Sequence, residues 1–210
     1  MKKIGLYQRI GVDIQPFLID SVDADLYVRP EDFIVGEILD GRICTIEKED
    51  SAQDKIFSQK YIHATLVKRN TSTIEACSTI SEENNIDFDD ITYCGLKDTL
   101  GLTAQRICIL NKGKLKKTKF RKFFLKNFTG SDQKLKPRDN NGNHFRIRVR
   151  NIADKNRLEK RLNKLLGDKI LLPNFYGPQR FGIRQNNHFL GKLLLEGKYY
   201  EFAVSFFNYY

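Results

Sequence analysis

A two-residue period of apolar side chains recurs in three segments of the chain, and this pattern constrains the fold more than any other feature. Residues 61–69 alternate in this way, and in residues 33–38 Phe, Val and Glu alternate with Ile, Gly and Ile. In residues 145–150, Phe, Ile and Val alternate with three arginines. Because successive side chains of a strand point to opposite faces, each segment predicts a β-strand with one buried face. The arginine face of the third strand is expected to meet solvent or phosphate.

A first amphipathic helix is predicted directly after the second of these strands. Ser72 and Glu75 have the spacing of a capping box, in which the two side chains satisfy free amide groups at a helix start. Ile74, Cys77 and Ile80 then recur at helical spacing and predict the buried face.

A second helix is predicted from Asp154, which is a suitable N-cap residue. Its apolar stripe consists of Leu158, Leu162, Leu165 and Leu166, and it is expected to end at Gly167. More leucine-rich helical sequence follows residue 187. Single helices placed among strands predict an α+β fold, a mostly antiparallel sheet with helices on one side.

A short connection between two predicted strands carries a possible reactive group. Residues 91–94 and 105–110 are predicted strands, and Gly95-Leu96-Lys97-Asp98 lies between them. The pattern therefore places a carboxylate on a loop. Taken alone, a glycine, a lysine and an aspartate are common in turns, and a structural role is the simpler interpretation.

The composition excludes several classes of protein. The 210 residues are 40% hydrophobic, which predicts one or two folded domains with a sizeable core. The longest apolar runs are far shorter than the roughly 20 residues of a membrane span, so we expect no membrane contact and a cytoplasmic location. The four cysteines contain no Cys-x-x-Cys pair, which predicts reduced, mostly buried thiols and no zinc site. They are Cys44, Cys77, Cys94 and Cys108.

Positive charge is concentrated in one part of the chain. The net charge is +10, and residues 112–150 hold fourteen basic residues against two acidic ones. Cations interleaved with phenylalanine suit an RNA backbone with apolar packing beneath. A lysine-rich helix with a solvated face and phenylalanines turned into the core is the structural alternative. The cations expected to contact RNA are Lys116, Lys117, Lys119 and Arg121.

Five motifs occur in a fixed order along the chain. They are R-P-E-D-F-I-V-G-E from residue 29, K-R-N-T-S-T from 68, G-L-K-D-T-L-G-L-T-A-Q from 95, G-N-H-F-R-I from 142 and P-N-F-Y-G-P-Q-R-F-G from 173. In this order and at these spacings, the series resembles the TruD family of tRNA pseudouridine synthases from about residue 29 to residue 203.

This resemblance implies an isomerase whose partner is tRNA. Such an enzyme breaks the N-glycosidic bond of a uridine, typically at position 13, and rejoins the ribose to C5 of the uracil. The resemblance implies no cofactor and no metal. A domain of residues 1–184 is expected to be the catalytic portion, and residues 185–210 to begin a helical insertion domain that is truncated here.

The same resemblance assigns roles to particular residues. Asp98 resembles the catalytic aspartate of the family, and Lys97 is expected to keep that carboxylate ionised. Phe145 resembles the aromatic residue that stacks on the target base, and Asn143 is expected to form a hydrogen bond near Asp98.

Two further contacts to the RNA follow from the residues themselves. A flipped base needs hydrogen bonds at its edge, for which Gln105 joins Asn143, and Arg180 is a candidate phosphate contact. Arg180 has a structural ion pair as its alternative role, and Glu37 is expected to order the first strand.

A non-catalytic basic RNA-binding module on the same scaffold is the alternative function. A structural RNA protein would explain the charge but not the ordered motifs.

Overall fold

The computed structural model describes residues 22–47, 58–167, 177–182 and 184–208. Residues 23–153 form one compact unit, and the described residues from Asp154 onward belong to a second. The functional boundary expected after residue 184 stays a prediction.

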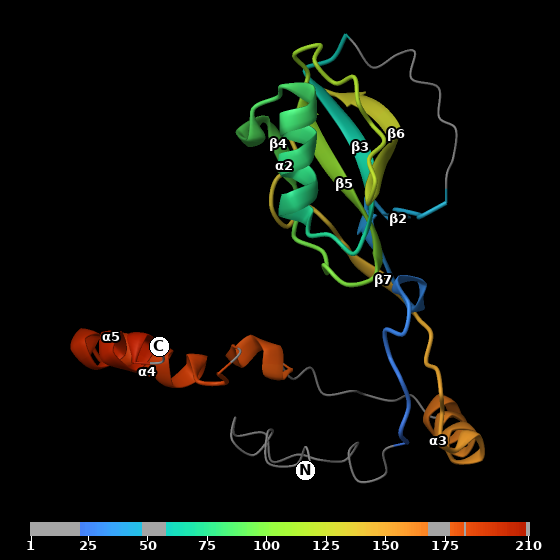
Figure 1. Ribbon diagram of the computed structural model, residues 1–210, viewed down its shortest axis with the longest axis vertical. Coiled ribbons are helices and arrows are strands. Elements are labelled where there is room, and N and C mark those ends of the chain that lie inside the picture. Colours follow the sequence, from blue (N-terminus) through green and yellow to red (C-terminus); the bar gives the residue numbers. More distant parts are fainter. Residues whose placement is uncertain (1–21, 48–57, 168–176, 183, 209–210) are drawn as a thin grey trace. The chain divides into compact units, whose positions relative to one another are not determined.

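The first unit is built around a mixed sheet of seven strands within the described residues (Figure 1). They are β1 (Phe33–Leu39), β2 (Arg42–Ile43), β3 (Tyr61–Arg69), β4 (Ile91–Tyr93), β5 (Leu102–Leu110), β6 (Phe123–Ser131) and β7 (Gly142–Ile147). The order is β2-β1-β5-β3-β6, with β4 paired to β5 and β7 paired to β1. Every pairing is antiparallel except β1 with β5, which is parallel. The predicted α+β fold with a mostly antiparallel sheet is confirmed.

Helix α2 (Thr73–Asn84) covers one face of this sheet, along β4, β5 and β3 (Figure 1). The Ser72 hydroxyl accepts a hydrogen bond from the Glu75 amide at 3.0 Å, which confirms the predicted helix start. Cys77 and Ile80 are buried as expected, but Ile74 is 50% exposed. The buried face is rotated toward Thr73 and Ala76, so the predicted position of Ile74 is wrong.

The core lies between α2 and the sheet. The β3 side chains Ile62, Ala64 and Leu66 are buried, as their alternation predicted. Phe123 on β6 is buried in the same cluster, and its ring stacks on Phe120 at 4.3 Å between centroids. These phenylalanines point inward as expected. The lysine-rich helix offered for them is wrong, because residues 111–122 form bends and irregular chain, with one isolated β-bridge from Lys119 to Phe124.

Two short 3-10 helices complete the first unit: η1 (Pro30–Asp32) precedes β1, and η2 (Phe88–Asp90) precedes β4. The fully buried Asp32 in η1 accepts two hydrogen bonds from Arg150, at 2.7 and 2.8 Å. This bidentate pair lowers the pKa of Asp32, the hydrogen bonds from Arg150 being the main cause. It ties the turn before β1 to the chain after β7.

Strand β7 lacks the buried face that its sequence pattern predicted. Phe145 is 52% exposed, Ile147 48% and Val149 42%. The strand pairs with β1 at the margin of the sheet, and the packed cluster beneath α2 contains none of its residues. A period of two shows which side chains share a face, but it does not show whether another layer covers that face.

In the second unit, helix α3 (Lys155–Gly167) begins where predicted. The Asp154 carboxylate accepts a hydrogen bond from the Arg157 amide at 2.9 Å, which confirms the expected N-cap. Leu162 is 44% exposed. The side chains of Leu165 and Leu166 lie outside the described residues.

The rest of the second unit comprises η3 (Pro178–Phe181), α4 (Asn187–Leu195) and α5 (Tyr199–Phe207). The helical sequence expected from residue 187 is therefore confirmed. Several large apolar side chains of α4 and α5 are exposed, including Leu195 at 91% and Tyr200 at 79%. Across the described parts of the chain, no helix is both long and apolar enough to cross a membrane.

The four thiols are free and buried, as their spacing predicted. Burial raises the pKa of Cys77 to about 12 and is the main cause of the rise of the Cys94 pKa to about 11. In the ranges that the structure describes, no group of three or more His, Cys, Asp or Glu side chains is arranged to hold a metal ion.

Candidate active site around Asp98

The connection between β4 and β5, residues 94–101, carries Asp98 on a loop, as the sequence predicted. Asp98 is exposed, whereas the neighbouring Lys97 is only 9% exposed. The loop therefore presents the Asp98 side chain to solvent and buries the side chain of the preceding residue, Lys97. The groups that bury Lys97 determine how firmly Asp98 is held.

Lys97 forms a buried ion pair with Glu37 of β1, with 2.7 Å between Nζ and Oε1. The other carboxylate oxygen of Glu37 accepts a hydrogen bond from the Arg106 amide at 2.8 Å. This amide lies between the part of β5 that pairs with β1 and the part that pairs with β4. Glu37 thus completes the edge of β5 and neutralises Lys97. The Lys97 ammonium group is directed at Glu37, whereas the sequence suggested Asp98 as the carboxylate that it serves.

Gln105 holds the other side of the loop. Its side chain is fully buried, and its amide nitrogen donates to the Gly95 carbonyl at 2.9 Å. Its amide oxygen accepts from the Thr73 hydroxyl at 2.8 Å, and that hydroxyl accepts in turn from the Lys97 amide at 3.2 Å. Gln105 therefore links the loop to the start of α2. This placement differs from the expected contact with the edge of a base.

Lys68 is a buried cation of this region that the sequence interpretation missed. It is 1% exposed, and its ammonium group donates to the carbonyl oxygens of Thr71 at 2.9 Å, Lys97 at 3.3 Å and Asp98 at 2.5 Å. Burial is the main cause that lowers the pKa of Lys68, to about 8. The sequence contains a signal for its burial, because Lys68 continues the apolar register of Ala64 and Leu66 on β3.

The far end of the loop is fixed by a close backbone approach. Gly101 has a φ of +103°, and a Cβ atom there would lie 2.5 Å from the Phe33 carbonyl oxygen. Only glycine fits this conformation at this distance. Asn70 also exchanges two hydrogen bonds with Gly101, at 3.1 and 3.2 Å. The loop is therefore anchored near both ends and in its centre.

The Phe33 ring adjoins this loop at Gly101 and lies between two further aromatic rings. The Phe33 ring lies 4.6 Å from the Tyr27 ring and 6.1 Å from the Phe145 ring, measured between centroids. Partial burial raises the pKa of Tyr27, and the negative charge of Asp98 adds to the rise. Tyr27 therefore lies within electrostatic range of Asp98. It precedes every motif and has an unusual φ of 63°, and no sequence pattern identified it.

The other predicted site residues occupy different places. Asn143 is exposed on β7 directly opposite Glu37, and Phe145 lies opposite Val35 on the same side of the sheet. Arg180 lies on η3 in the second unit and is exposed. The predicted RNA-contacting cations are all exposed in the connection between β5 and β6. They are Lys116, Lys117, Lys119 and Arg121, and Lys117 pairs with Glu83 at 2.7 Å.

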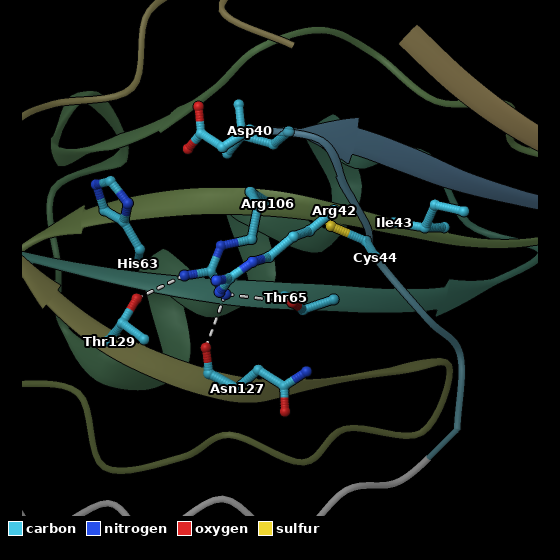
Figure 2. A pocket seen from close by; sticks show the side chains of 10 residues that line it. Asp40, Arg42, Ile43, Cys44, His63, Thr65, Arg106, Asn127 and Thr129 are labelled. Atoms are coloured by element: carbon cyan, nitrogen blue, oxygen red, sulfur yellow. Dashed lines mark hydrogen bonds between the residues drawn. The ribbon is translucent and has the colours of Figure 1, made fainter. Parts of the chain in front are cut away.

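A pocket of about 710 Å³ lies on the opposite face of the sheet (Figure 2). Its lining includes Arg106, whose guanidinium donates to the Asn127 carbonyl at 2.7 Å and to the Thr129 hydroxyl at 2.6 Å. A third hydrogen bond reaches the Thr65 hydroxyl at 3.3 Å. Figure 2 shows Arg42 extending toward this group from β2. The lining of this pocket includes none of the site residues predicted from the sequence.

Comparisons with known proteins agree with the family that the motifs resemble. A family model described as "tRNA pseudouridine synthase D (TruD)" matches residues 12–209. A Methanococcus vannielii protein named "Probable tRNA pseudouridine synthase D" is 35% identical over 185 residues, which cover 86% of this chain and 46% of that protein. A protein of the same name from Pyrococcus abyssi is 37% identical over 194 residues, covering 90% of this chain and 44% of the relative.

A solved structure gives the same result for the fold. A crystal structure from Methanosarcina mazei described as "Putative tRNA pseudouridine synthase D (TruD)" matches with a TM-score of 0.73 and 28% sequence identity, over 96% of this chain and 45% of that one. The chain spans about half the length of the curated relatives it matches. The match to the family model extends over nearly all of the residues, and the chain therefore belongs to the TruD family of tRNA pseudouridine synthases.

Proposed function

We propose that this chain supplies the catalytic carboxylate of a tRNA pseudouridine synthase and that Asp98 is that residue. The substrate is a uridine in tRNA, at position 13. The reaction breaks the bond between N1 of the uracil and C1′ of the ribose, and it forms a bond between C5 and C1′. The proton leaves C5 and N1 gains one, so the reaction is a balanced isomerisation.

The observation that carries this proposal is the way the fold presents Asp98. The loop backbone is held from below by Lys68, Gln105 and the Lys97–Glu37 pair, while the Asp98 side chain remains exposed. A nucleophile or base must be accessible and must also be held in one geometry. A carboxylate that merely capped a turn would not need three separate buried anchors beneath it.

The exposed aromatic ring of Phe145 supports the same function. C5 of a uracil cannot be reached inside a stacked helix, so the nucleotide must be flipped into a site that offers an aromatic face. Phe145 is more than half exposed and adjoins Phe33, which packs next to the loop end at Gly101. Stacking on Phe145 would place the base on the same side of the sheet as Glu37 and Lys97.

The exposed cations between β5 and β6 support tRNA as the partner. Lys116, Lys119 and Arg121 are exposed and lie in a segment that contains no acidic residue of its own, although the neighbouring Lys117 pairs with Glu83. They also favour a second candidate function, a basic module that binds RNA without modifying it. A cytoplasmic location follows from a tRNA substrate and is part of the same proposal.

The test is conversion of uridine in a tRNA transcript by the parent chain and by Asp98→Asn. The amide keeps the size and hydrogen-bonding capacity of the side chain but lacks its charge and proton affinity. We expect Asp98→Asn to bind the transcript normally and to form no detectable pseudouridine. Asp89→Asn, which changes an exposed carboxylate on η2, is the matched control and should retain activity.

The alternatives give different results in this experiment. Turnover by Asp98→Asn near the parent rate would remove Asp98 from the catalytic role. Tight binding of the transcript by the parent, without any pseudouridine, would favour the non-catalytic RNA-binding module.

A further inference from the structure

Lys68 and the loop that bears Asp98 are joined by more hydrogen bonds than a packing role requires. All three acceptors of the ammonium group are backbone carbonyl oxygens, and two of them belong to Lys97 and Asp98. We propose that Lys68 is a positioning residue, which fixes the direction of the Asp98 side chain by holding the carbonyl groups of these two residues. The inference rests on the proposed function.

The geometry explains how a contact to the backbone controls a side chain. The carbonyl group of Asp98 is attached to the same Cα atom as its Cβ, so fixing the carbonyl limits the directions in which the carboxylate can leave the loop. Holding the preceding carbonyl of Lys97 as well fixes the peptide plane between the two residues. The third hydrogen bond of the Lys68 ammonium group goes to the Thr71 carbonyl oxygen. This bond ties the peptide plane to the turn before α2.

Burying a lysine in this position has a cost that points to such a role. A cation held only by neutral oxygens is more expensive to bury than an apolar side chain, and Leu66 shows that the same register of β3 accepts one. The titratable groups that act on Lys68 are Asp98, Lys97 and the Cys77 thiol of α2. Bonds from a charged donor are stronger than neutral ones, so the ammonium group holds the loop more firmly than a hydroxyl or amide would.

The first measurement is amide hydrogen exchange in the parent chain and in Lys68→Met, and it needs no enzymatic activity. Methionine keeps an unbranched side chain of similar length but donates no hydrogen bond. We expect exchange in residues 94–101 to become at least ten-fold faster, while β3 and the centre of α2 change little. Unchanged protection of the loop would overturn the proposal.

Lys126→Met is the matched control for this variant. Lys126 is also a buried lysine, 5% exposed, and its ammonium group donates to the Thr45 hydroxyl at 3.0 Å and to the Glu47 carbonyl. It lies on β6 opposite Thr65, on the other face of the sheet. Loss of a buried lysine as such would affect both variants. Faster exchange of residues 94–101 in Lys126→Met would therefore count against a specific role for Lys68.

The second measurement is turnover of a tRNA transcript. For Lys68→Met we expect kcat to fall ten- to a hundred-fold with KM nearly unchanged, because a displaced reactive group lowers the rate without weakening the remote contacts to RNA. A purely structural defect would instead lower the fraction of active molecules equally in both lysine variants. If the parent itself forms no pseudouridine, the proposed function fails, and hydrogen exchange still decides the role of Lys68.

A third measurement on the parent protects the test against a variant that does not fold. An ammonium group bound to three carbonyls shows slow proton exchange in NMR, together with scalar couplings from its nitrogen to the carbonyl carbons of Thr71, Lys97 and Asp98. Detection of these couplings supports the proposal. A freely rotating Lys68 ammonium group without them would overturn it.

Discussion

Lys68 and Arg106 are buried or half-buried cations on opposite faces of the same pair of strands, yet they serve different parts of the structure. Lys68 donates only to backbone carbonyls, two of them in the Asp98 loop. Arg106 reaches across β3 to β6. The pairing between these two strands shifts its register between His63 and Thr65 of β3, and Asn127 of β6 has a φ of 50°. One cation therefore holds a loop, and the other braces a β-bulge beneath an open pocket.

This difference shows that burial alone does not identify a functional charge. Both side chains are satisfied by neutral oxygens, and burial is the main cause that lowers the pKa of each. What separates them is the element at the other end of the hydrogen bonds. Variants of these two cations and of the charged groups around them test this distinction.

The largest effect is expected from breaking the ion pair beneath the Asp98 loop. Glu37→Gln leaves the Lys97 ammonium group buried without a counter-charge, and we expect the free energy of unfolding to fall by about 3–5 kcal/mol. Urea unfolding measures the change. Glu31→Gln is the control, because the Glu31–Arg69 pair is exposed and should contribute less than about 1 kcal/mol. Equal effects in the two variants would contradict the buried ion pair.

The second prediction concerns pH and distinguishes Lys68 from a lysine in solvent. Its pKa is about 8 in the folded chain against an ordinary value of 10.5, so between these values the unfolded chain binds more protons. Stability from this group therefore rises with pH from about 8 to 10.5, by up to about 3 kcal/mol, and is constant below pH 8. Above pH 9, the raised pKa values of Cys77 and Cys94 act in the opposite direction.

The contribution of Lys68 is isolated by subtracting the pH profile of Lys68→Met from that of the parent. The Cys94 thiol is common to both proteins and cancels in this difference, which then reports Lys68 together with its electrostatic coupling to Cys77. A flat difference between pH 8 and 10.5 would show that Lys68 titrates like an ordinary lysine.

The third prediction concerns the bulge on the other face. Arg106→Met removes hydrogen bonds to Thr65, Asn127 and Thr129, and we expect a loss of about 1–3 kcal/mol in the free energy of unfolding. Amide exchange should accelerate in β6 near Asn127 but not in residues 94–101. Faster exchange of the Asp98 loop in this variant would remove the proposed difference between the two cations.

The smallest effect on stability is expected from the exposed cations. Combined charge reversal at Lys116, Lys119 and Arg121 should change the free energy of unfolding by less than about 0.5 kcal/mol, because these side chains are solvated. It should nevertheless flatten the salt dependence of RNA binding, since each lost phosphate contact removes about 0.7–0.9 from the slope of log K against log salt. A fluorescence anisotropy titration at several salt concentrations measures this slope, and an unchanged slope would place the RNA elsewhere.

Local pattern was sufficient for the elements and for the position of Asp98. The period of two in residues 61–69, the capping box at Ser72 and the N-cap at Asp154 each depend on neighbours a few residues away, and each is confirmed. The same short range placed Asp98 on a loop between β4 and β5. Ile74 was misplaced because the capping residues fix where α2 starts but not which side of it faces the sheet.

The anchors of the site could not be predicted in this way, because they depend on pairing between distant strands. Lys97 meets Glu37 only because β1 lies parallel to β5, although 60 residues separate them in the sequence. The exposure of Phe145 depends on what covers β7, which its own alternation does not contain. Lys68 is the exception, because a lysine that continues the apolar register of a strand can be recognised from the sequence alone.

The parallel pairing of β1 with β5 also has a consequence for how fast the site assembles. Strands β3 to β6 and α2 lie within residues 61–131 and include neighbouring antiparallel partners, whereas β1 must find β5 and β7 across loops of more than 60 and 100 residues. Closing such loops costs chain entropy before any contact repays it, and non-local pairing of this kind slows folding. Glu37 and Phe33 both reside on β1, so the geometry around Asp98 is complete only once this long-range docking has occurred.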